Sequence, residues 1–455
     1  SDTNFILEMS STFAEDVKAI EVATGVLSSE GGYASHAPVV ARSLGKVALV
    51  YPGAKFLKNA MKIGDVNVKE GDYITLNVPY YDPPVIYFGK ASLTKPTPEG
   101  SGLLELLDIA QEFIGDGFDV HANADQPKDA QLAQTFLAKG IGLCRTEHMF
   151  FEGDRITAMR EMILADDEKG RRKALEKLLP IQREDFEGIF EAMSGLPVTV
   201  RLLDPPLHEF VPHEEKNQKA IADQLGLSAS EVKAKVESLF EFNPMLGHRG
   251  CRLGNTYPEI TEMQARAIIE AALNLKSKGT EVLPEIMIPL IGTLEELKMQ
   301  EDIVRSTVNQ VFEERNDSID YLVGTMIEVP RAALTADEVA HSAEFFSFGT
   351  NDLTQMTFGY SRDDAGRFLP IYLNKGILKN DPFQVLDQTG VGQLVEMGVK
   401  KGRTTRSDLK IGICGEHGGE PSSVEFCHRV GMNYVSCSPY RVPIARLSAA
   451  IAAVR

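Results

Sequence analysis

The chain has 455 residues, of which 43% are hydrophobic, 25% charged and 7% aromatic, a globular composition that excludes a disordered chain. Its formal net charge of −18 disfavours broad binding to nucleic acid or an anionic membrane, and no apolar run approaches the roughly 20 residues of a membrane-spanning helix. Five cysteines without a CxxC pair exclude a disulfide scaffold and indicate reduced thiols in the cytoplasm, or in an organelle stroma or matrix.

Residues 1–89 predict a small α/β domain. Apolar, β-rich runs lie at 5–7, 25–27, 47–50 and 73–76, and helical stretches are expected between them. Residues 89–102 are rich in Pro, Gly, Ser and Thr, a composition that packs poorly. We therefore predict a linker over 90–112.

Within the small domain, residues 31–42 read Gly-Gly-Tyr-Ala-Ser-His-Ala-Pro-Val-Val-Ala-Arg. The paired glycines predict a tight turn, and Pro38 suits the first turn of a helix that begins near His36. Free N–H groups and the helix dipole at such a site favour a phosphate and a neutral, nucleophilic imidazole. His36 is thus a candidate phosphoryl acceptor; the alternative is a turn histidine in a helix cap.

Residues 113–455 predict a (β/α)8 barrel, because short apolar runs alternate there with longer amphipathic segments. The predicted strands lie near 118–121, 141–145, 198–203, 245–249, 285–290, 322–328, 345–350 and 410–416. Residues 205–243 are too long for a simple connection and predict a helical excursion from the third unit.

Three arginines end consecutive predicted strands: Arg145, Arg201 and Arg249. The C-terminal ends of barrel strands share one mouth, where active sites lie. Three guanidinium groups gathered there suit a small dianion or trianion. For a single arginine an ordinary surface salt bridge is the better interpretation, but three at successive strand ends favour a site.

Glu328 and Asp352 lie at the ends of the sixth and seventh predicted strands, which are neighbours. Two carboxylates, completed by substrate oxygens and water, suit Mg²⁺. The alternative is a carboxylate pair whose charges are balanced by the nearby arginines. The spacing of the residues does not decide between such a pair and a metal site.

Cys414 ends the last predicted strand, between Gly412 and Gly415. A thiol there could exchange a proton with a carbon atom of a substrate if its pKa is tuned, although a lone cysteine is more often inert packing. Inert packing is the interpretation for the other cysteines, Cys144, Cys251, Cys427 and Cys437.

Taken together, these segments resemble one enzyme family over nearly the whole chain. Residues 31–42 resemble the phosphohistidine motif of phosphoenolpyruvate-utilising enzymes. Five longer strings are similar to the pyruvate phosphate dikinases within that family: 142–151, 201–210, 243–251, 349–355 and 413–421. Two of them argue against phosphoenolpyruvate synthase and the sugar-transport phosphotransferase enzyme, namely Leu-Cys-Arg-Thr-Glu-His and Leu-Asp-Pro-Pro-Leu-His-Glu.

The resemblance implies a phosphohistidine domain joined to a barrel that binds phosphoenolpyruvate or pyruvate, in a homodimer with Mg²⁺. The implied activity is reversible phosphoryl transfer between phosphoenolpyruvate and a carrier histidine, one half of the reaction ATP + phosphate + pyruvate = AMP + diphosphate + phosphoenolpyruvate. By the same resemblance, His36 is the carrier and Cys414 the acid-base at the methylene carbon. The implied substrate contacts are Arg145, Arg201, Arg249, Glu328, Gly349, Thr350, Asn351 and Asp352, of which Glu328 and Asp352 also hold the metal.

Two departures from the family qualify this expectation. The family's ATP-grasp domain does not precede the histidine motif in this sequence, so we expect the phosphoenolpyruvate half-reaction alone unless that domain is supplied upstream or in trans. Ala34 stands where the family usually has threonine. A non-catalytic homologue that binds phosphoenolpyruvate or pyruvate, or regulates a partner, is a further alternative. It is disfavoured by the intact set of Arg145, Arg201, Glu328, Asp352 and Cys414.

Overall fold

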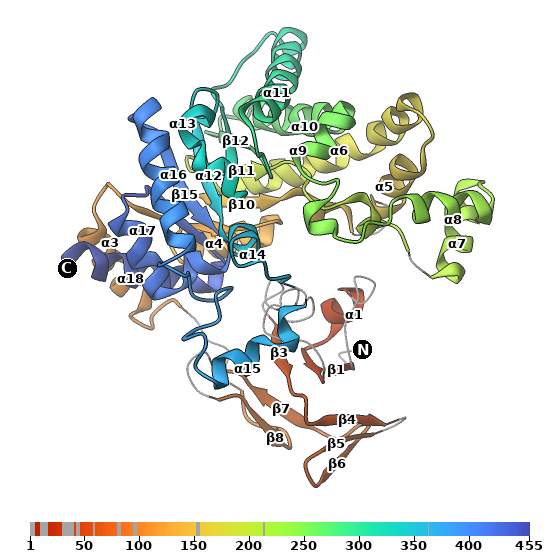
Figure 1. Cartoon of the computed structure of the whole chain (residues 1–455), viewed down its shortest axis with the longest axis vertical. Helices are drawn as coiled ribbons and strands as arrows, with labels where there is room; N and C mark the ends of the chain where they lie inside the picture. The colour runs from red at the N-terminus through yellow and green to blue at the C-terminus, as the bar shows by residue number, and fades with distance from the viewer. Residues whose placement is uncertain are drawn as a thin grey trace. The chain divides into compact units, whose positions relative to one another are not determined.

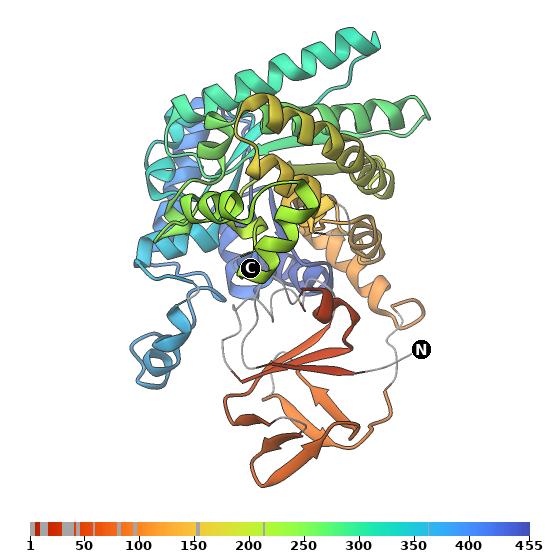
Figure 2. The same cartoon turned by 90° about the vertical axis from the view of Figure 1, so that its right-hand side faces the viewer.

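The computed structural model describes residues 5–9, 17–29, 41, 46–57, 60–79, 83–93, 98–151, 155–212, 214–362 and 364–455. The chain divides into two compact units, each taken here by itself (Figures 1 and 2). The smaller unit comprises Ser1–Gly100 and Gly359–Phe383, and the larger comprises Ser101–Phe358 and Gln384–Arg455.

The larger unit is a closed barrel of eight parallel strands, which confirms the predicted (β/α)8 fold. The strands are β9 (Asp119–Asn123), β10 (Ile141–Arg145), β11 (Pro197–Arg201), β12 (Leu283–Ile288), β13 (Leu322–Ile327), β14 (Phe345–Gly349), β15 (Lys410–Cys414) and β16 (Tyr434–Cys437). They pair in chain order, and β16 closes the ring on β9. Most of their residues are buried, because helices cover a parallel sheet from outside and side chains fill it from inside.

Helices surround the strands (Figure 1). The longer ones are α3 (Leu103–Ile114), α4 (Pro127–Thr135), α5 (Arg155–Leu164), α6 (Glu168–Ala192), α10 (Pro258–Lys276), α11 (Leu294–Arg315), α14 (Thr350–Phe358), α16 (Val391–Thr405), α17 (Pro421–Arg429) and α18 (Val442–Val454). Shorter turns are η2 (Thr146–Phe150), α9 (Cys251–Thr256), α12 (Pro330–Leu334), α13 (Ala336–Val339), η6 (Glu416–Gly419) and η7 (Pro439–Arg441).

One predicted strand is wrong. Residues 245–249 form no strand; they lie in and after the short 3-10 helix η4 (Pro244–Leu246). Proline begins this turn, Leu246 is 52% exposed, and Gly250 has φ +57°, a backbone conformation unsuited to a strand. The barrel instead gains β16 (Tyr434–Cys437), which was not predicted.

The predicted helical excursion over 205–243 is confirmed. It comprises η3 (Leu207–Phe210), α7 (Glu215–Leu225) and α8 (Ala229–Ser238). A capping box at Ser228 and Glu231 begins α8. The excursion shares a second hydrophobic cluster with α5 and α6, separate from the main barrel core.

The described residues of the smaller unit form three small sheets. The first pairs β1 (Ile6–Met9), β2 (Gly25–Ser28) and β3 (Val47–Val50) in parallel, with α1 (Val17–Val22) between β1 and β2. The second is the antiparallel sheet β4 (Ala54–Leu57), β5 (Ala60–Ile63) and β6 (Val66–Lys69), and the third is the pair β7 (Ile74–Asn77) and β8 (Val85–Phe88).

The expected helical stretch between residues 50 and 73 is therefore wrong, because β4–β6 occupy it. The local sequence explains the difference. Met61, Ile63 and Val68 are buried in alternation with exposed residues, and Gly64, with φ +57°, makes the two-residue turn that pairs Ile63 with Val66.

Two segments lie elsewhere than the predicted domain bounds placed them. Residues 103–112, assigned to the linker, form most of α3, whose buried Leu107 and Ile114 pack in the barrel unit. Residues 359–383, assigned to the barrel, group with the smaller unit and contain η5 (Ala365–Arg367) and α15 (Leu369–Asn374). In the described part of the chain, no helix is both long enough and apolar enough to span a membrane.

Candidate functional site

Most of the predicted site residues of the barrel lie at the C-terminal ends of its strands. Arg145, Arg201, Gly349 and Cys414 are the last residues of β10, β11, β14 and β15, and Glu328 directly follows β13. Thr350, Asn351 and Asp352 form the first turn of α14. Because parallel strands of a closed barrel end at one mouth, these side chains share one rim.

Arg249 reaches the same rim from a loop rather than from a strand. The Gly250 N–H donates to Asp204 O at 2.9 Å, and the Cys251 N–H donates to Pro289 O at 3.1 Å. These bonds attach the loop to the segments that follow β11 and β12. The three arginines therefore lie at one rim as predicted, although Arg249 does not end a strand.

Buried carboxylates hold two of the arginines in a continuous chain of ion pairs. Arg201 binds Glu147 and, at 3.0 Å, Asp204. Arg249 binds Asp204 at 2.7 Å and Asp352 at 3.4 Å. Although burial disfavours the charged forms, these carboxylates raise the pKa of both arginines. Because the pairs are buried, they are not the ordinary surface salt bridges considered as the alternative.

Arg145 is more accessible, with 29% of its side chain exposed, and Asp125 orients it. Asp125 lies just after β9 and accepts the Arg145 backbone N–H at 2.7 Å and Nη1 at 3.5 Å. The Nδ1 atom of His148 lies 2.7 Å from the same carboxylate. Burial alone would raise the pKa of Asp125, but His148 and Arg145 outweigh it and hold the pKa below its usual range.

Glu328 is a buried carboxylate next to a second one. It accepts the Leu290 N–H at 2.7 Å, and burial, followed by the charges of Asp352 and Asp204, raises its pKa to about 8. A Cβ on Gly349 would lie 2.3 Å from Glu328 Oε2, so glycine is required beside it. In the described residues no cluster of three or more His, Cys, Asp or Glu is placed to hold a metal, and Glu328 and Asp352 remain a pair.

Cys414 lies among barrel-interior side chains. It is 3% exposed and packs with Leu143, Met287 and Met326. Burial raises the pKa of its thiol, so the protonated form prevails at neutral pH. All five cysteines are free and buried; Cys414 differs from the others in that the charges of Glu328, Arg145 and Arg201 all act on its thiol.

Several buried polar atoms at the rim have no hydrogen-bond partner in the described part of the chain. Among them are the donor Arg201 Nε and the acceptor Asn351 Oδ1. Beside Asn351, His417 Nδ1 lies 2.6 Å from Thr350 Oγ1. Since buried polar groups are normally satisfied, the free donor and the free acceptor indicate that a polar ligand completes the site.

The predicted carrier His36 lies outside the described residues, as does Ala34. Sequence reasoning also missed four residues that support the rim: Asp125, Glu147, Leu290 and His417. A signal existed for three of them, because Asp125, Glu147 and His417 each follow a barrel strand by two or three residues. Leu290 had no such signal, because it supports the rim only through its backbone N–H, which donates to Glu328. The positive φ of +63° that places this N–H is not readable from the sequence.

Comparison with known proteins gives a consistent result. Residues 108–454 match the family described as "PEP-utilising enzyme, PEP-binding domain", and residues 2–78 match "PEP-utilising enzyme, mobile domain". The chain is 54% identical over 453 residues to a pyruvate, phosphate dikinase of Clostridium symbiosum, covering 99% of this chain and 51% of that protein. It is 53% identical over 454 residues to the chloroplastic pyruvate, phosphate dikinase 1 of Arabidopsis thaliana, covering 98% and 46%. The chain thus spans about half the length of these curated relatives.

Proposed function

The chain belongs to the phosphoenolpyruvate-utilising enzymes, and from this membership we propose that it transfers a phosphoryl group reversibly between phosphoenolpyruvate and His36, giving pyruvate. The proposal rests mainly on the side chains that lie at the barrel rim. Arg145, Arg201 and Arg249 gather there with two acids and a protonated thiol, which are the groups that an enol phosphate requires.

Substrate binding rests on the arginines. Phosphoenolpyruvate carries a carboxylate and a phosphate, both of which match guanidinium forks. Arg201 retains a free Nε and Arg145 is exposed, so both can receive the anion while Asp204 and Asp125 hold them in place. Asn351, with its unsatisfied Oδ1, is the contact that fixes the orientation of the substrate.

The residues at the rim also fit Mg²⁺. Glu328 and Asp352 offer hard oxygen ligands. Burial, and after it the charge of Asp352, raises the pKa of Glu328, and a divalent cation relieves the repulsion between the two carboxylates. When bound by Glu328 and Asp352, the ion supplies positive charge that favours negative charge on substrate oxygens. The alternative is a carboxylate pair whose negative charges are balanced by arginines alone. Asp352 does form an ion pair with Arg249, whereas Glu328 makes no ion pair among the described residues.

The chemical step transfers the phosphoryl group and then a proton. The neutral imidazole of His36 attacks phosphorus in line, so that an N–P bond forms while the bond from phosphorus to the enol oxygen breaks. The resulting enolate takes the proton of the Cys414 thiol at its methylene carbon and becomes pyruvate. In the reverse direction the Cys414 thiolate removes a methyl proton, and the enolate oxygen attacks phosphohistidine.

Three further features follow from the relatives. We propose a homodimer in the cytoplasm or in an organelle stroma or matrix; some relatives are chloroplastic by name. The ATP-dependent half of the dikinase reaction requires an ATP-grasp domain, upstream or in trans. We assign the phosphoenolpyruvate half to the two matched regions, with residues 1–89 as the carrier domain, 90–100 as the connection and the larger unit, which begins at Ser101 and includes α3, as the barrel.

Labelling with phosphoenolpyruvate that carries ³²P tests the proposal. We expect Mg²⁺-dependent label on the intact chain, stable to alkali and labile to acid, and lost in His36→Ala. His341→Ala is the matched control, because His341 is an exposed histidine on the barrel unit. Absence of label on the wild-type chain, or label that persists in His36→Ala, would overturn the proposal.

A further inference from the structure

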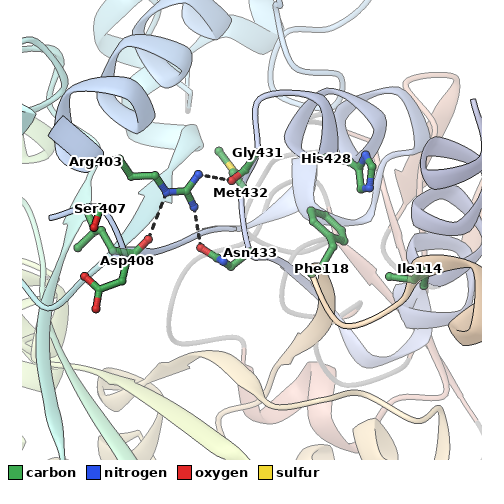
Figure 3. Close-up of a pocket in the computed structure, with 11 residues that line it drawn as sticks. Ile114, Phe118, Arg403, Ser407, Asp408, His428, Gly431, Met432 and Asn433 are labelled. Carbon is green, nitrogen blue, oxygen red and sulfur yellow. Dashed lines mark hydrogen bonds between the residues drawn. The ribbon is translucent and has the colours of Figure 1, made fainter.

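A hollow of about 420 Å³ lies at the end of the barrel opposite the candidate site (Figure 3). Phe118, Leu409 and Asn433 line it and directly precede β9, β15 and β16. These three strands are neighbours, since β16 pairs with both of the others. The hollow therefore lies at N-terminal strand ends, whereas the candidate site lies at C-terminal ends, and the two are separate.

An arginine without a counter-charge forms one wall. Arg403, on α16, donates Nε to Leu409 O at 3.4 Å, Nη1 to Gly431 O and Nη2 to Asn433 Oδ1 at 2.8 Å (Figure 3). All three acceptors are neutral, and Arg403 makes no ion pair with any described residue. Burial alone lowers its pKa, which is the mark of a cation whose charge is not compensated.

Two N–H groups of the Arg403 guanidinium and the side-chain amide of Asn433 have no hydrogen-bond acceptor among the described residues. Arginine has five N–H groups, and three are used, so one on each Nη has no acceptor among the described residues. Asn433 Oδ1 accepts from both Arg403 and the Ile411 N–H, at 2.8 Å each. The Nδ2 group of Asn433 is consequently left as a donor toward a ligand.

The opposite wall is largely apolar. The ring of His428 meets Phe118 edge to face, with centroids 5.3 Å apart and an interplanar angle of 65°. Ile114, which is buried, lies on the same side (Figure 3). Pockets that combine an apolar surface with a few directed polar groups typically bind small organic molecules, and here the directed groups are donors.

We propose that this hollow is a second ligand site, which binds a small organic anion with its carboxylate or phosphate on Arg403 and Asn433 and its apolar part against Phe118 and Ile114. An anion compensates the half-buried guanidinium through charge-assisted hydrogen bonds, which are the stronger kind. Asp408 also lines the hollow and opposes an anion by its charge, so it limits the affinity.

Calorimetric titration with phenyl phosphate tests this site. Saturating oxalate, a planar dianion shaped like enolpyruvate, is included to occupy the arginines of the barrel mouth. We expect one oxalate-insensitive site, weakened about 10-fold or more in Arg403→Gln. If no heat remains with oxalate present, the probe bound only at the barrel mouth or not at all, and the proposal is overturned.

A second variant keeps the test independent of folding, because Arg403 also joins α16 to the segment before β16. Asp408→Asn removes an exposed negative charge at the edge of the hollow. It is expected to tighten phenyl phosphate about two- to five-fold, as loss of an exposed like charge does. An oxalate-insensitive affinity that neither Arg403→Gln nor Asp408→Asn changes would place the probe elsewhere and contradict the assignment.

Discussion

At the residue scale, Asp125 connects two parts of the candidate site. It holds both the backbone and the guanidinium of Arg145, and it also meets His148. A carboxylate in this position accepts all three groups at once, whereas an amide of the same shape accepts through one oxygen only. Asp125 is thus a positioning residue for Arg145.

We predict that Asp125→Asn weakens the binding of phosphoenolpyruvate about 10-fold, because Arg145 loses its fixed orientation while its charge remains. Calorimetric titration with phosphoenolpyruvate in the presence of Mg²⁺ measures the change. Asp302→Asn is the matched control, since Asp302 is an exposed aspartate on α11. Equal losses in the two variants would contradict the assignment.

Glu328 predicts a proton release that does not depend on activity. With a pKa of about 8, it carries about 0.9 proton at pH 7, and Mg²⁺ requires the carboxylate. We expect Mg²⁺ binding to release nearly one proton at pH 7 and to strengthen as pH rises from 6 to 9. Titration in two buffers of different ionisation enthalpy measures the release, and Glu328→Gln should abolish it. No release from the wild-type chain would be evidence against this metal site.

The same shift has a consequence for stability. The pKa of Glu328 is higher in the folded chain than its usual value of 4.5, so the folded state binds more protons than the unfolded state between these values. Without a metal ion the folded chain is therefore expected to lose stability as pH rises through this window toward 8, and less so in Glu328→Gln. Urea midpoints at pH 5.5 and 8.5 measure the difference; an equal pH dependence in both chains would contradict it.

Much of the site could be predicted at this scale, because Arg145, Arg201 and Cys414 end apolar runs that read as strands. The place of Asp125 just after a strand was visible, but its partner was not, since it binds Arg145 at the end of the neighbouring strand β10. Leu290 could not be predicted, because a positive φ at a leucine has no sequence signal.

At the scale of elements, Arg446 joins three segments of the barrel unit through hydrogen bonds. It lies on α18, is fully buried, and donates to Leu107 O of α3 at 2.8 Å and to Leu137 O after α4 at 2.7 Å. Both acceptors are backbone carbonyls that water cannot readily reach once α18 packs on α3. Helix α3 is therefore part of the barrel unit although the sequence around it resembles a linker.

We predict that Arg446→Met lowers the free energy of unfolding by about 2–4 kcal/mol, because two carbonyl groups lose a charged donor. Urea denaturation provides the measurement. Arg455→Met is the control: Arg455 makes an exposed ion pair with Glu425, which contributes at most about 1 kcal/mol. A loss in Arg446→Met no larger than in the control would show that the buried contacts are not what joins these helices.

The two strand errors have a common physical origin. Residues 245–249 contain apolar side chains but begin after Pro244 and end before Gly250. The N–H groups of Leu246 and Gly247 make local turn bonds, and the Gly250 N–H bonds to Asp204 O after β11 rather than to a strand. The strand β16 (Tyr434–Cys437) has four buried residues, too short a run to stand out from the turn before it. In both cases tertiary hydrogen bonding decides, and periodicity carries little information about it.

At the scale of the whole molecule, the barrel was predictable because seven of its eight strands are apolar runs separated by helical segments. The fold of the smaller unit was harder to predict from the sequence. Its strands are four residues each and its sheets are small, so hairpin turns such as Gly64-Asp65 specify it more than hydrophobic periodicity does.

The central claim is that the barrel rim converts between pyruvate and its enolate, with the thiol of Cys414 as the acid-base. Proton NMR of pyruvate in D₂O with Mg²⁺ follows this exchange without involving His36. We expect deuterium in the methyl group with the wild-type chain and with the variant Cys427→Ala, which changes a buried cysteine on α17, and none above background with Cys414→Ala. Exchange that continues in Cys414→Ala, or a wild-type chain that exchanges nothing, would contradict it.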